Sequence, residues 1–89
     1  MMKKKQTKSE RLDERLDELN DFLNLKKGTI HAYRAYNGTL LATGTNDILY
    51  GVERMSDGKM IDVVDQIISV VKYSIKPFDS LTDVFDEVR

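Results

Sequence analysis

The first regular pattern along the chain is a leucine stripe with the spacing of a helix. The stretch ERLDERLDEL, after Ser9, contains strong helix formers and neither Gly nor Pro. Four leucines recur at intervals of four, three and four residues: Leu12, Leu16, Leu19 and Leu23. Two heptads are too few for a free-standing coiled coil. We therefore expect a helix over residues 9–24, capped by Ser9 and followed by Gly28 in the left-handed conformation, that docks on its own sheet or on a partner.

Three segments in the middle of the chain are typical of strands: residues 29–36, 39–44 and 48–55. Asn37-Gly38 separates the first two and is a strong hairpin signal, because both residues tolerate positive φ. A two-residue turn there would place Tyr36 opposite Thr39 and Arg34 opposite Leu41. The sequence therefore predicts a three-stranded antiparallel meander.

The predicted register divides the hairpin side chains between two faces. One face carries His31, Tyr33, Ala35, Leu40 and Ala42. The other carries Ile30, Ala32, Arg34, Tyr36, Leu41 and Thr43. We expect the first face to meet the core, because the second holds Arg34 and Thr43. The second face is still half apolar, which is typical of an interface.

The last third of the chain changes to helical spacing. After a predicted turn at residues 56–60, five apolar residues of segment 60–75 share one helical face: Ile61, Val64, Ile68, Val71 and Ile75. The β-branched second half leaves a partial strand open as an alternative. Lys76-Pro77 ends this segment, and a short helix capped by Asp79 or Ser80 follows. The expected fold class is α+β in the order α-β-β-β-α-α, with one domain over residues 8–89 and a disordered basic arm over residues 1–7.

Composition narrows the class of protein. The 89 residues include no cysteine, and one third are charged with a formal net charge of -1. No apolar run is long enough to span a membrane, and the lack of cysteine suits a reducing cytoplasmic location. Residues 1–31 hold eight Lys/Arg against six Asp/Glu, whereas residues 60–89 hold three against six. A basic start therefore precedes an acidic end.

Candidate chemistry is sparse. His31 is the one histidine, and without cysteine or a nearby serine no nucleophile–base pair is indicated. The spacing of Asp83, Asp86 and Glu87 matches no calcium-loop pattern. Gly38 and Gly44 are separated by a strand, and no helix follows them to hold a phosphate. We expect no enzyme activity, cofactor or metal.

Protein binding accounts for more of these features than catalysis does. We expect a small non-enzymatic interaction module, a homodimer that binds or inhibits another protein, and in size and style it resembles accessory proteins of bacteria or their phages. The leucine stripe or the second sheet face would serve self-association, and the acidic last helix would take a basic partner. The predicted interface residues are Leu12, Leu16, Leu19, Leu23, Ile30, Tyr36, Leu41, Asp83, Asp86 and Glu87.

Nucleic-acid binding is the alternative. Its basic residues would be Lys3, Lys4, Lys5, Lys8, Arg11 and Arg34. Sheet tyrosines could stack on unpaired bases. The predicted register places Tyr33 and Tyr36 on opposite faces, however, which prevents a single stacking platform.

Overall fold

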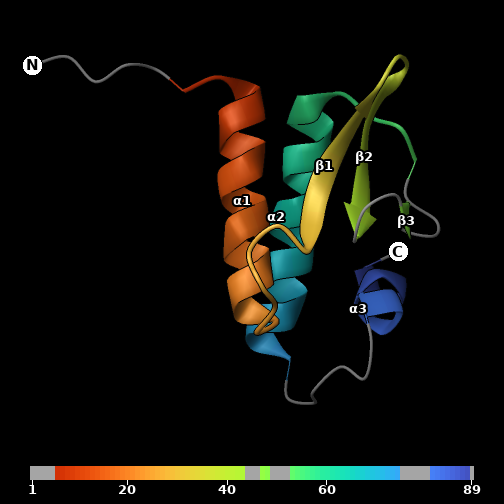
Figure 1. Ribbon diagram of the computed structural model, residues 1–89. Coiled ribbons are helices and arrows are strands. Elements are labelled where there is room, and N and C mark those ends of the chain that lie inside the picture. The colour runs from red at the N-terminus through yellow and green to blue at the C-terminus, as the bar shows by residue number, and fades with distance from the viewer. Residues whose placement is uncertain (1–5, 44–46, 49–52, 75–80, 89) are drawn as a thin grey trace, which may run out of the picture.

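The chain folds as an α+β unit with an N-terminal helix, a two-stranded antiparallel sheet and two C-terminal helices (Figure 1). The structure is a computed structural model that describes residues 6–43, 47–48, 53–74 and 81–88. The long elements are α1 (Lys8–Phe22), β1 (Ile30–Ala35), β2 (Gly38–Thr43), α2 (Asp57–Tyr73) and α3 (Leu81–Val88). No helix in these residues is long and apolar enough to cross a membrane. The predicted basic arm lies almost entirely outside the described residues.

The predicted three-stranded meander is wrong. In place of a strand over residues 48–55, the described residues contain a two-residue strand, β3 (Asp47–Ile48), and a single bridge from Met55 to Thr39. Asp47 pairs with Thr43, and Met55 pairs with Thr39. Between these two pairs the chain from Asp47 to Met55 is eight residues long, whereas the facing part of β2 is four residues long. The segment is too long for a continuous ladder with β2, and its residues 49–52 lie outside the described part.

The N-cap of helix α1 lies two residues before the predicted one. Thr7, not Ser9, is the N-cap, and its Oγ1 accepts a hydrogen bond from the backbone N–H of Glu10 at 3.1 Å. Thr7 and Glu10 have the spacing of a capping box, but here the Thr7 hydroxyl, and not its backbone N–H, donates to the Glu10 carboxylate. At the other end, Asn24 adopts the left-handed conformation with φ 58°, and Leu25 N–H donates to the Asn20 carbonyl. Asn24 therefore closes the helix, and Gly28, four residues on, has the positive φ that the sequence predicted (87°).

The β1–β2 hairpin turns one residue earlier than predicted. Ala35 pairs with Gly38 and Arg34 with Thr39, so Tyr36 and Asn37 form the turn. Gly38 has φ 131°, and a Cβ atom there would lie 2.7 Å from the carbonyl oxygen of Met55. This glycine thus permits the close approach of the Met55 segment. The pairing shifts by two positions, which leaves the two predicted sets of side chains on their faces.

The face that meets the helices is the opposite of the one predicted. Ile30 and Leu41 are buried with α1 and α2 in the core cluster. On the predicted core face Leu40 and Ala42 are also buried, outside that cluster, whereas Tyr33 is 44% exposed. Of the two polar residues that argued against this face, Thr43 pairs with Ile30 at the end away from the turn, and Arg34 reaches the helices at the turn end. Thr39, opposite Arg34, donates a hydrogen bond to Asp57. The polar atoms of Arg34 and Thr39 are therefore satisfied beside the core.

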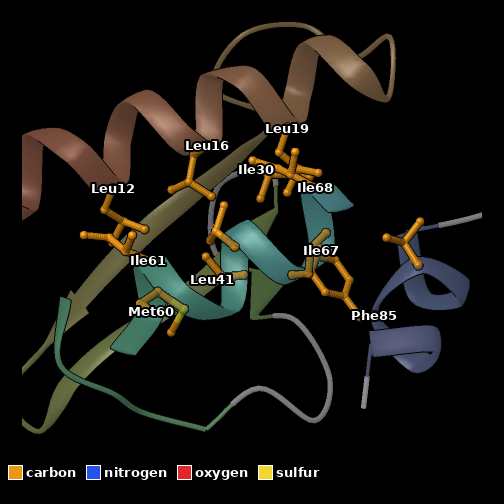
Figure 2. Close-up of a cluster of buried hydrophobic side chains, with 12 residues drawn as sticks. Leu12, Leu16, Leu19, Ile30, Leu41, Met60, Ile61, Ile67, Ile68 and Phe85 are labelled. Carbon is orange, nitrogen blue, oxygen red and sulfur yellow. The ribbon is translucent and has the colours of Figure 1, made fainter. Parts of the chain in front are cut away.

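Helices α1 and α2 run side by side in the same direction and support the hairpin (Figure 1). Arg15 Nε lies 2.9 Å from Asp65 Oδ1 between them. Ser56 caps α2, so residues 56–60 start the helix and do not form the predicted turn. Helix α3 adds Phe85, which points toward Ile67 (Figure 2). The core consists of Leu12, Leu16, Leu19, Ile30, Leu41, Met60, Ile61, Val64, Ile67, Ile68, Val84 and Phe85.

Candidate functional site

Most of the predicted apolar interface is interior. Five of these side chains are at most 2% exposed within the single chain: Leu12, Leu16, Leu19, Ile30 and Leu41. Leu23 is half-buried against the same core. These residues hold the hairpin, α1 and α2 together, so a second molecule cannot reach them without opening the fold.

The polar members of the predicted interface lie on the surface. Tyr36 is fully exposed in the hairpin turn. Asp83, Asp86 and Glu87 are exposed on α3. The structure does not bring Tyr36 and these three carboxylates together, because Tyr36 belongs to the hairpin turn and the carboxylates to the last helix.

The alternative, nucleic-acid surface is only partly described. Lys3, Lys4 and Lys5 lie outside the described residues, and Lys8 and Arg11 are exposed at the start of α1. Helix α1 carries three basic residues against six carboxylates, those of Glu10, Asp13, Glu14, Asp17, Glu18 and Asp21. All six are exposed, which gives this helix a negative surface that repels phosphate.

His31 is partly exposed on β1, on the side of the sheet away from the helices. Within the described residues, no group of three or more His, Asp or Glu could hold a metal ion. Described buried side-chain polar atoms all have hydrogen-bond partners, so none is left pointing unsatisfied into a cavity.

The outer edge of β1 presents unpaired backbone groups. Thr39 of β2 exchanges both backbone hydrogen bonds with Met55, on the side away from β1. In an antiparallel pair, residues whose backbone groups point away from the partner strand face each other. Arg34, opposite Thr39, and Ala32, opposite Leu41, therefore direct their N–H and C=O groups away from β2.

Asn20 independently confirms this direction. Ile30 is in phase with Ala32 and Arg34, and its N–H and C=O groups both bond to the Asn20 side chain, at 2.9 and 3.0 Å. Asn20 is 1% exposed and also donates to the Leu16 carbonyl at 2.8 Å. The N–H and C=O groups of Ile30, the first outward-directed pair on this edge, are thus already hydrogen-bonded to α1.

The next two outward pairs are open. Among the residues that the structure describes, none forms a hydrogen bond with the outward N–H and C=O groups of Ala32 and Arg34. An edge strand with free N–H and C=O groups is a template for pairing with another chain. Tyr33, between them, projects its half-exposed ring from the opposite face of the sheet.

Arg34 anchors the turn end of this edge to both long helices. Its Nη2 donates to Ser9 Oγ at 2.7 Å and lies 3.7 Å from Asp13 Oδ1 on α1. Its Nε lies 3.7 Å from Asp57 Oδ2, and Asp57 in turn accepts a hydrogen bond from the Thr39 hydroxyl. The cluster holds β1 in position before any partner binds.

A shallow pocket lies at the other end of the edge. It has a volume of about 300 Å³ and is lined by Asp17, Asn20, Asp21, Leu25 and Lys27. Asn20 joins this pocket to β1, because the same amide binds Ile30. Lys27 Nζ lies 3.6 Å from Asp17 Oδ2, and both side chains are largely in solvent.

Reasoning from the sequence missed Asn20, Ala32 and the pocket carboxylates. One signal was present for Asn20, which follows Leu16 by four residues and so lies beside the leucine stripe on a helix. A polar residue at such a position must find buried partners. No protein-family model, curated protein or solved structure matches this chain. What the chain binds is therefore inferred from the β1 edge.

Proposed function

We propose that this chain is a small non-enzymatic protein-binding module that takes an extended segment of a partner protein as an added strand on β1. The observation that carries the proposal is the open backbone of Ala32 and Arg34 beside an outward pair already closed by Asn20. Added-strand recognition obtains affinity from backbone hydrogen bonds and selectivity from side-chain pockets. Both elements are found along this edge.

Backbone pairing alone would be weak. Each hydrogen bond contributes on the order of 1 kcal/mol net, and two open residues offer four groups. Ordering a flexible segment opposes this gain. Binding therefore needs side-chain contacts as well, and the half-exposed Tyr33 ring and the pocket beside Asn20 supply them.

Self-association, which the sequence predicted, is disfavoured at this edge. Arg34 contacts Ser9 and Asp13, and Ile30 contacts Asn20, so α1 runs along β1 on the helix side of the sheet. Pairing β1 with β1 of a second copy would bring two acidic α1 helices together across the seam. Like charges at such a seam repel. A different protein fits this edge better than a second copy.

The test first selects peptides that bind the chain and then removes one backbone N–H group from the β1 edge by substitution. A library of short peptides displayed on phage is panned against the chain, and selected peptides are titrated against Ala32→Pro and Ala32→Ser. Proline removes the outward N–H of residue 32 but no hydrogen bond to β2, and such positions tolerate proline on edge strands. Serine retains the N–H and controls for the altered side chain.

We expect Ala32→Pro to weaken peptide binding about tenfold or more while Ala32→Ser binds normally. Circular dichroism melting verifies that each variant is folded. Selected peptides that bind folded Ala32→Pro as tightly as the unchanged chain, or a library that yields no binder, would refute the proposal. Should Ala32→Pro fail to fold, amide hydrogen exchange at residues 32 and 34 in the unchanged chain decides, because strand addition must slow both.

A further inference from the structure

We infer that the captured segment is basic and that one of its Lys or Arg side chains occupies the pocket of Asp17 and Asp21. This inference rests on the proposed function, because it assigns the charge of the added strand. Three observations carry it: the course of α1 along the edge, the charge of the pocket and the fixed Arg34 cluster at the opposite end.

The added strand would lie directly beside α1. Arg34 meets Asp13 near the start of the helix, and Ile30 meets Asn20 near its end, so β1 and α1 run in opposite directions along the edge. Side chains of an added strand alternate between the two sheet faces. Those opposite Arg34 and Ala32 would face the helix side. The Asn20 amide occupies the position opposite Ile30, so the segment would leave the edge there, beside the pocket.

The pocket is negative overall. Asp17 and Asp21 face a single ammonium group, that of Lys27. Lys27 is 81% exposed and its 3.6 Å contact with Asp17 is a surface ion pair, which is worth little and is readily exchanged. Asp21 forms no hydrogen bond or ion pair with any other side chain that the structure describes.

The position of the pocket on α1 adds to this charge. It lies at the C-terminal end of the helix, where the macrodipole contributes negative potential. Cations are the usual complement at such an end, yet the last turn of α1 contains no basic residue. A cation brought by a partner would interact with the helix end and with both carboxylates at once.

The charge preference is confined to one end of the strand. At the turn end, the Arg34 guanidinium already occupies the space between Asp13 and Asp57. A second cation opposite Arg34 would meet this fixed positive charge. The segment should therefore carry its Lys or Arg just beyond the residue opposite Ala32, with an uncharged residue opposite Arg34.

Three designed probes test the charge directly. They are alternating Val-Thr peptides that differ at one position near one end, which holds Lys, Gln or Glu. Their dissociation constants are measured at low and high salt for the unchanged chain, for Asp21→Asn and Asp17→Asn, and for Asp62→Asn. Asp62 is an exposed carboxylate on α2 and serves as the matched control.

We expect the Lys peptide to bind about tenfold more tightly than the Glu peptide at low salt, with the Gln peptide between them and the difference reduced at high salt. Asp21→Asn and Asp17→Asn should each reduce this preference, and Asp62→Asn should not. Equal affinities for the three peptides, all lost in folded Ala32→Pro, would overturn the charge assignment and leave the edge in place. Absence of binding by all three, or binding insensitive to Ala32→Pro, would overturn both.

Discussion

The side-chain amide of Asn20 forms both backbone hydrogen bonds of Ile30. Its Oδ1 accepts from the Ile30 N–H at 2.9 Å, and its Nδ2 donates to the Ile30 carbonyl at 3.0 Å. The amide thus occupies the position of a neighbouring strand residue. It attaches β1 to α1 at one end, while Arg34 attaches it at the other. Within the described residues of β1, the outward backbone groups of Ala32 and Arg34 then remain open to a partner.

Replacing Asn20 should destabilise the fold strongly. Asn20→Ala leaves the N–H and C=O of the buried Ile30 without partners, and we expect a loss of about 2–4 kcal/mol in the free energy of unfolding. Urea denaturation measures this loss. A loss under about 0.5 kcal/mol, the range of ordinary surface substitutions, would show that the two hydrogen bonds are not maintained in solution.

Asn20→Asp adds a dependence on pH. The charged carboxylate would face the carbonyl oxygens of Leu16 and Ile30, whereas the protonated acid can still donate to one of them. Its pKa in the folded variant should therefore lie above its unfolded value, so the deficit in stability grows as pH rises through that pKa. Denaturation at about pH 4 and about pH 7 should show a larger deficit at the higher pH. Asn37→Asp, in the exposed turn, should show no comparable change.

Two glycines with positive φ separate backbone strain from steric contact. Gly28 has φ 87° with open space around it, whereas a Cβ at Gly38 would lie 2.7 Å from the Met55 carbonyl oxygen. Gly28→Ala should lower the free energy of unfolding by about 1 kcal/mol, because of backbone strain alone. Gly38→Ala should lower it by about 2–4 kcal/mol, because the new Cβ must also displace the Met55 backbone. Thermal melting of both variants compares the costs. Equal losses would mean that the Met55 segment does not lie against the turn.

The burial of Leu16 allows a test of whether the leucine stripe is core or interface. Leu16 is 2% exposed inside the single chain. Leu16→Ala should cost about 2–5 kcal/mol, and its denaturation midpoint should not depend on protein concentration. A midpoint that rises with concentration in the unchanged chain and not in Leu16→Ala would instead place this residue between two copies.

The long helices were predictable because their apolar spacing is unambiguous. Leu12 and Leu16 mark one face of α1, and Ile61, Val64 and Ile68 mark one face of α2, over lengths that exceed ordinary strands. Their ends were harder, because Thr7 and Ser9, or Ser56 and Asp57, offer similar caps within a few residues. Only the packed structure selects one of them.

The sheet was less predictable because its pairing depends on distant residues. The hairpin turn moved to Tyr36-Asn37 because Gly38 is needed where Met55 approaches β2. The core face was misassigned because Arg34 and Thr43 count as polar in a pattern, yet Arg34 is satisfied by Ser9 and Asp57 from the helices. The open edge could not be inferred at all, since it follows from the strand order and from Asn20.

The central claim is that β1 accepts an added strand, and amide exchange measured residue by residue tests it most directly. The Lys-containing Val-Thr peptide is added to the isotopically labelled chain, and exchange rates are followed by NMR. Strand addition predicts that the amides of Ala32 and Arg34 become protected, while that of Ile30, already bonded to Asn20, changes little. Binding of this peptide without protection of Ala32 and Arg34 would contradict the account.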